Sequence, residues 1–84
     1  MIIDMRIALG KKIRAAREKQ QLTQPELAKR IHSSRTRIAK IEAGEEGVRL
    51  DLMTTAALAV GMTRKHIAKA IESQAALEFL RVTS

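Results

Sequence analysis

Residues 24–44 read QPELAKRIHSSRTRIAKIEAG. The middle of this stretch, residues 29–40, carries five positive charges and no acid. Its apolar residues nevertheless recur at the spacing of a helix. A solvated helix face would account for the charge, and so would a rigid surface held against a polyanion.

The net positive charge of the chain comes from its N-terminal half. The whole chain has a net charge of +7, and residues 1–44 carry all of it, with eleven Lys and Arg against four Asp and Glu. Residues 45–84 hold five of each sign. The N-terminal half is therefore a candidate polyanion binder, although charge alone does not separate DNA, RNA and anionic lipid.

Length and composition indicate one small folded domain over residues 1–84. The apolar fraction of 45% is too high for a disordered chain, and the single aromatic residue, Phe79, leaves the core to aliphatic side chains. The absence of cysteine fits a reducing cytoplasm. No apolar run is long enough to span a bilayer, and the N-terminus does not resemble a signal peptide.

Helical periodicity predicts an all-α fold, a bundle of five helices. These are a helix over about residues 4–19, a short one from Gln24, one that ends at 43, one over 50–60 and one over about 64–80. Thr23 with Glu26 fits a capping box, and Ser34 and Thr63 fit single caps. Gly44 suits the left-handed residue that ends a helix.

The second and third of these helices are a candidate helix-turn-helix over residues 24–43. The motif needs a small residue inside its first helix, where the second crosses closely, and Ala28 fits. Ile38 and Ile41 would anchor the second helix in the core. The residues left outside are Arg35, Thr36, Arg37, Ala39 and Lys40.

The stretches LTQPELAKRIHSSRTRIAKIEAG and LDLMTTAALAVGM together resemble the family of phage lambda and 434 repressors and Cro, the XRE-type bacterial regulators. With Arg17 included, the resemblance covers roughly residues 9–62. It implies base-reading roles for Arg35, Thr36 and Lys40, and contacts with the DNA backbone for Gln24, Ser34, Arg37 and Arg49. It also implies that Arg17 and Glu42 form a partly buried structural pair.

The sequence departs from this family at the turn and in the next loop. His32 stands where the family usually has Gly, at a position that needs a left-handed backbone. Ser33 replaces a small apolar residue. Glu45 and Glu46 occupy a loop that is often basic in relatives, which leaves Arg49 as its candidate phosphate contact.

Other site chemistries find little support. Neither His32 nor His66 has a second ligand at metal spacing, so we predict no metal. The sequence has no Gly-rich phosphate loop, no cysteine and no pair of acids in a cleft-forming context, so we also predict no cofactor and no enzymatic activity. A membrane role for the first helix would compete with its place in the core. Single-stranded RNA binding would lack the aromatic side chains on which bases stack.

The apolar stripe of the last helix leaves two alternatives open. It can complete the core of the single chain, or it can pair two chains, with Ile67, Ile71, Phe79 and Leu80 at the interface. A homodimer is favoured because operators normally present two half-sites. We therefore expect a cytoplasmic, bacterial or phage-encoded repressor that binds double-stranded DNA at a palindromic operator. The alternative is an antitoxin that binds a toxin protein and represses its own operon.

Overall fold

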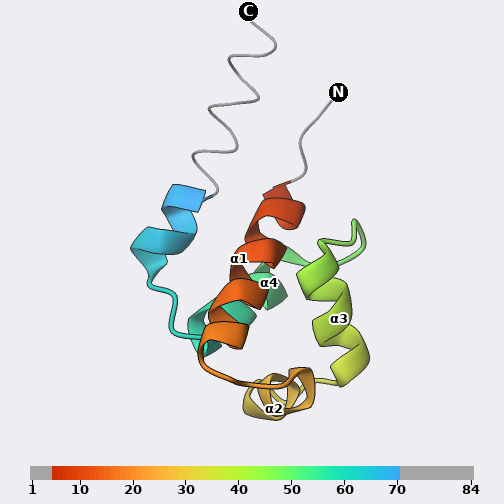
Figure 1. Cartoon of the computed structure of the whole chain (residues 1–84). Helices are drawn as coiled ribbons and strands as arrows, with labels where there is room; N and C mark the ends of the chain where they lie inside the picture. The colour runs from red at the N-terminus through yellow and green to blue at the C-terminus, as the bar shows by residue number, and fades with distance from the viewer. Residues whose placement is uncertain (1–4, 71–84) are drawn as a thin grey trace, which may run out of the picture.

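The structure is a computed structural model, and it describes residues 5–70 (Figure 1). Every regular element within that range is a helix, as the sequence predicts. The helices are α1 (Met5–Lys19), α2 (Gln24–Arg30), α3 (Arg35–Ala43) and α4 (Leu50–Ala59), followed by helical residues 64–70. None of the described helices is long and apolar enough to cross a membrane.

The predicted helix caps are present. The Thr23 hydroxyl accepts from the backbone N–H of Glu26, and the Glu26 carboxylate accepts from the backbone N–H of Thr23, which completes the capping box. The backbone N–H and the hydroxyl of Thr23 hold the pKa of Glu26 below its ordinary value, because both stabilise the carboxylate. Thr63 likewise accepts from the backbone N–H of His66. These local contacts set where α2 and the helical residues 64–70 begin.

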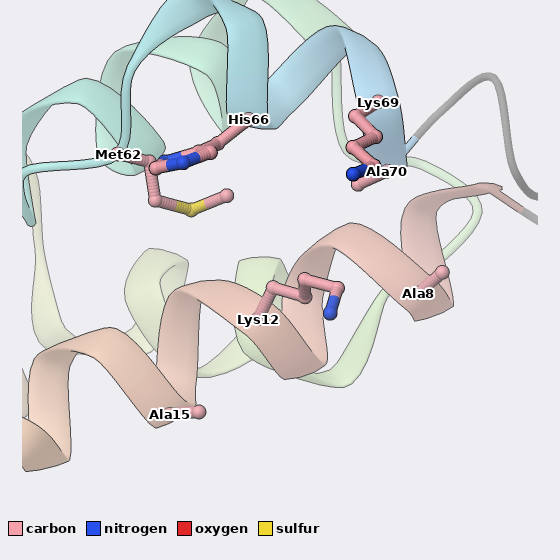
Figure 2. A pocket seen from close by; sticks show the side chains of 7 residues that line it. All are labelled: Ala8, Lys12, Ala15, Met62, His66, Lys69 and Ala70. Carbon is pink, nitrogen blue, oxygen red and sulfur yellow. The ribbon is translucent and has the colours of Figure 1, made fainter.

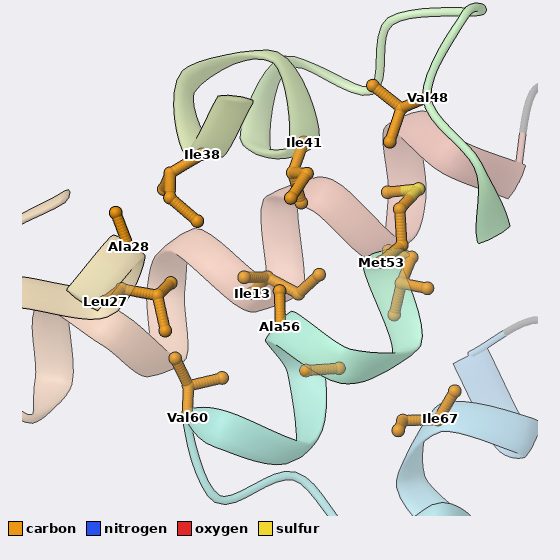
Figure 3. Close-up of a cluster of buried hydrophobic side chains, with 12 residues drawn as sticks. Ile13, Leu27, Ala28, Ile38, Ile41, Val48, Met53, Ala56, Val60 and Ile67 are labelled. Carbon is orange, nitrogen blue, oxygen red and sulfur yellow. The ribbon is translucent and has the colours of Figure 1, made fainter. Parts of the chain in front are cut away.

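The core collects aliphatic side chains from every helix (Figure 3). Its largest fully buried members are Leu9, Ile13, Leu27, Ile38, Ile41, Met53 and Val60. Burying a side chain of this size contributes about 1.5–3 kcal/mol, so these residues supply most of the driving force for the bundle. Helix α1 supplies Leu9 and Ile13 to the core and packs against α3 and α4, whereas α2 packs mainly against α3.

Close packing of α1 against α3 depends on a glycine inside α1. A Cβ atom at Gly10 would lie 2.5 Å from the carbonyl oxygen of Ile41 and 2.8 Å from that of Glu42. Since such separations are too short for any side chain, glycine lets the two helix backbones touch. Glycine in a helix interior costs about 1 kcal/mol relative to alanine, and this contact offsets that cost.

Left-handed backbone positions end two of the helices. Gly44 has φ 68° and closes α3, as predicted, and Gly61 has φ 86° just after α4. Within residues 5–70, two residues other than glycine also have positive φ: His32, at 53°, and Gln21, at 58°. The sequence predicted the first from its place in the turn but missed Gln21, which lies between α1 and α2.

The fifth helical stretch is attached to the bundle through Ile67. Its side chain is 5% exposed and belongs to the core of the single chain. It is therefore largely covered before any partner binds, which argues against its predicted place in a dimer interface. The other three predicted interface residues, Ile71, Phe79 and Leu80, lie outside the described residues.

Candidate nucleic-acid interface

Helix α3 has one buried face and one exposed face. Ile38 and Ile41 are completely buried, so their side chains fix the rotation of the helix about its axis. The exposed face holds every residue that the sequence left outside the core: Arg35, Thr36, Arg37, Ala39 and Lys40. Within the described residues Arg35, Arg37 and Lys40 make no ion pair. The result is a rigid helix that presents uncompensated positive charge.

A short turn connects α2 to α3 and sets the angle between them. The backbone N–H of Ser33 donates to the carbonyl oxygen of Ala28, at 2.8 Å, and His32 takes the left-handed conformation. Ser34 then begins α3, because its Oγ accepts from the backbone N–H of Arg37 at 3.2 Å. A hydroxyl that accepts this bond keeps its own proton to donate, so Ser34 can bind a phosphate oxygen while it caps the helix.

The Ser33 hydroxyl destabilises this turn. Its Oγ is buried and has no hydrogen-bond partner. A buried polar atom without a partner costs free energy, because it has given up its bonds to water. This fits the departure seen in the sequence, where a serine stands at a position that usually carries a small apolar residue.

Arg17 and Glu42 form a buried ion pair between α1 and the end of α3. Arg17 Nε donates to Glu42 Oε2 at 2.6 Å, and Arg17 Nη2 donates to Glu42 Oε1 at 3.0 Å. Arg17 Nη1 donates to the carbonyl oxygen of Leu22 at 2.7 Å. The hydrogen bonds to Glu42 raise the pKa of Arg17 above its ordinary value, although burial acts in the opposite direction. The guanidinium therefore ties three segments together while it stays charged.

Gln24 connects this pair to the surface. It is the first residue of α2, it is half-buried, and its Nε2 donates to Glu42 Oε1 at 3.1 Å. One amide hydrogen and the amide oxygen of Gln24 are left for other partners. The contact places Gln24 beside the end of α3, where it can orient the exposed face or bind a phosphate.

Two other basic side chains are engaged elsewhere. Arg30 Nη1 donates to the carbonyl oxygen of Ala59 at 3.3 Å, which directs this charge toward α4. Arg49, the predicted phosphate contact after the acidic loop, pairs with Asp51 at 3.3 Å between Nε and Oδ1. Both partners are well exposed, so the pair is weak and a phosphate could replace Asp51.

Sequence reasoning missed several residues that position this surface. Gly10 allows α3 to approach α1, and the signal for it was a lone glycine inside a helical pattern. Arg6 Nε donates to the carbonyl oxygen of Val48 at 2.8 Å, which holds the loop after α3. The Nε2 of Gln20 donates to the carbonyl oxygen of Val60. Nothing local in the sequence indicates either of these two contacts, since each joins residues about forty positions apart.

The two histidines lie apart from any ligand cluster. His32 and His66 are both exposed, and within residues 5–70 no group of three or more His, Cys, Asp or Glu side chains could hold a metal ion. The described surface thus offers positive charge and hydrogen-bond donors, a chemistry that suits phosphate oxygens and base edges.

Comparison with known families agrees with this geometry. The model of the helix-turn-helix domain family matches residues 8–70, which is most of the chain. The chain belongs to this family. A search of curated proteins and a search of solved structures gave no significant match. Membership indicates a DNA-binding regulator, and it is in line with the resemblance to XRE-type regulators.

Proposed function

We propose that the protein is a sequence-specific regulator that binds double-stranded DNA with α3 in the major groove. The observation that carries this proposal is the exposed, uncompensated positive face of α3, held in place by the fully buried Ile38 and Ile41. A major groove admits an α-helix, and a fixed helix can present side chains to base edges in one register.

The exposed residues of α3 suit two kinds of contact. Arg35 can donate two hydrogen bonds to O6 and N7 of a guanine, and Lys40 and Thr36 can donate to neighbouring bases. Contacts with the DNA backbone are assigned to Gln24, Ser34, Arg37 and Arg49. Of these, Ser34 and Gln24 are supported by the donors that their observed hydrogen bonds leave unused.

We further propose that residues 1–84 act as one domain, and that two copies bind a palindromic operator as a repressor. Half-sites one DNA turn apart would match the two-fold symmetry of a homodimer. The segment beyond residue 64 is assigned to dimerisation, with Ile71, Phe79 and Leu80 as its apolar contacts. Such a protein would act in the cytoplasm of a bacterium, where it would be encoded by the host or by a phage.

The alternative is an antitoxin that binds a toxin protein. It would need an apolar docking patch outside the dimer interface. The large apolar side chains that residues 5–70 expose are Ile7, Leu50 and Leu58, each a little under half exposed. Single exposed apolar residues are ordinary on protein surfaces, so they favour neither function, and the charge on α3 favours the regulator.

Selection of bound sites from random DNA by the purified protein tests the proposal. We expect one palindromic motif to be enriched. Affinity for it should fall steeply with salt. If the Lys and Arg side chains of residues 29–40 neutralise about four phosphates per protomer, or eight per dimer, the slope of log K against log salt is near −7 at about −0.9 per phosphate. A slope near zero, or no enriched sequence, would contradict the proposal.

A further inference from the structure

A groove runs between α1 and residues 62–70, on the side of α1 away from α3 (Figures 1 and 2). It has a volume of about 570 Å³. One wall is formed by Ala8, Lys12 and Ala15, and the other by Met62, His66, Lys69 and Ala70. Because α3 lies on the opposite side of α1, an occupant of this groove would leave the DNA-binding face open.

The groove is lined by apolar and basic side chains. Its apolar lining consists of three alanines and Met62, and the alanines let a helix or an extended segment approach closely. The amino groups of Lys12 and Lys69 extend into the groove from its two walls, and no acidic residue lines it (Figure 2). Within the described residues neither lysine makes an ion pair. The groove therefore suits a partner that carries both apolar side chains and carboxylates.

Residues 71–84, IESQAALEFLRVTS, have this composition. They include the apolar residues Ile71, Leu77, Phe79 and Leu80, and two carboxylates, Glu72 and Glu78, against the single cation Arg81. This matches a groove with two lysines and no acid. The charge of the segment and the charge of the groove are thus complementary.

The sequence also indicates which copy of the segment fits. Residue 71 follows directly on Ala70, which lines the groove, so the segment would have to reverse direction to occupy the groove of its own chain. Residues 71–84 contain no Gly, Pro, Asn or Asp, and Ser73 is the one residue near the start of the segment of a type that favours tight turns. Binding to a second copy requires no such reversal, so a second chain is the simpler partner for the segment.

We propose that the groove of each chain binds residues 71–84 of a second copy, in a reciprocal two-fold dimer. The proposal deepens the homodimer of the proposed function by naming the surface that receives the segment. In each groove, Lys12 and Lys69 contact Glu72 and Glu78 of the other copy. The apolar side chains of the segment cover Ala8, Ala15 and Met62.

Two charge-reversed variants test this arrangement by sedimentation at micromolar concentration and low salt, without DNA. The first reverses the groove, with Lys12→Glu and Lys69→Glu, and the second reverses the segment, with Glu72→Lys and Glu78→Lys. Each variant alone should be monomeric, since like charges face each other at both contacts. An equimolar mixture should form a one-to-one heterodimer, because opposite charges then meet in both grooves.

A control variant carries the same charge change on the same two helical segments. Lys11→Glu with Lys65→Glu alters exposed residues that do not line the groove, and it should remain dimeric. All the altered lysines are exposed, so circular dichroism should show unchanged helix content. If a double variant nevertheless unfolds, the single changes Lys12→Glu and Glu78→Lys replace it. Each alone should raise the dimer dissociation constant by less than the double variant, and mixing the two should lower it again.

Three outcomes would overturn the proposal: a monomeric parent, variants that stay dimeric alone, or a mixture that stays monomeric. The last would mean that the segment binds its own chain or another surface. Because the readout contains no DNA, a protein that forms the heterodimer but selects no DNA sequence would refute the proposed function and leave this inference standing. A protein that selects a DNA sequence but does not form the heterodimer would refute this inference and leave the proposed DNA binding standing.

Discussion

Arg17 and Arg35 have the same side chain in opposite surroundings. Arg17 is 8% exposed, and its guanidinium donates to Glu42 and to the carbonyl oxygen of Leu22. Arg35 is exposed, lies at the start of α3 and has no ion pair within residues 5–70. The difference teaches that a positive charge in this chain is structural where its partner is internal, and is available for binding where it has none.

The largest effect should come from removing the partner of Arg17. Glu42→Ala leaves a buried guanidinium without its carboxylate, which typically costs about 3–5 kcal/mol. That is a large part of the stability of a small domain. Chemical denaturation should therefore show much lower stability, while the preferred DNA sequence of the remaining folded protein should be unchanged.

A double variant separates the penalty of an unpaired charge from the worth of the pair. In Arg17→Met with Glu42→Leu no charge is left buried, so most of the lost stability should return. If Glu42→Ala instead melts like the parent but binds DNA poorly, Glu42 acts at the DNA and the contrast between the two arginines fails.

The contact between α1 and α3, which brings Arg17 and Glu42 together, can be disturbed without changing a charged residue. Gly10→Ala places a Cβ atom against the carbonyl oxygens of Ile41 and Glu42, so α3 must move away from α1. Overpacking of this kind costs about 1–3 kcal/mol, and the better helix propensity of alanine offsets about 1 kcal/mol of that loss. Thermal unfolding measures the loss, and Gly47→Ala is the matched control, because a Cβ there meets no atom within 4 Å. Equal stability of the two variants would show that the helices do not touch.

Arg35 should show the opposite behaviour to Glu42. Arg35→Ala should leave stability unchanged, weaken operator binding by about 1–3 kcal/mol and relax the preference at one base pair in each half-site. Arg37→Ala should weaken all sequences about equally, as expected for a phosphate contact. Binding to a panel of operator variants measures both. If both substitutions lower affinity uniformly, Arg35 does not read a base.

The smallest effect, and one of opposite sign, is expected at the turn. Ser33→Ala removes a buried hydroxyl that has no partner, so the protein should become more stable by about 1 kcal/mol. Ser34→Ala is the contrasting variant, because it removes the cap of α3 and should destabilise by about 1 kcal/mol. Denaturation midpoints of the two variants should lie on opposite sides of the parent. A destabilised Ser33→Ala would mean that the hydroxyl has a bound water or another partner.

Much of this molecule follows from short-range signals in the chain. Thr23, Glu26 and Ser34 predicted where helices begin, and Gly44 predicted where α3 ends, because capping bonds join residues only a few positions apart. The 3.6-residue periodicity predicted that Ile38 and Ile41 face inward. The exposed face of α3 could therefore be predicted as well, since it is what remains of the helix.

Other features depend on contacts between distant parts of the chain. Periodicity places Arg17 on the stripe of Leu9 and Ile13, and Arg14 outside it, but it does not show what Arg17 pairs with. In the folded chain Arg17 contacts Glu42, while Arg14 makes an exposed contact with Glu18. The family resemblance pointed to Glu42, but only the folded chain shows that Arg17 also donates to the carbonyl oxygen of Leu22 and that Gln24 donates to Glu42.

Sequence alone thus determined the helices, their caps and the division of α3 into an inner and an outer face. Only the tertiary structure decided that Gly10 is a point of contact, that Ile67 belongs to the core of the single chain, and that Lys12 and Lys69 face one groove. The physical reason is the separation in sequence over which each kind of interaction acts. Caps and periodicity act within a few residues of one another, whereas packing brings together side chains whose separation in sequence carries no local signal.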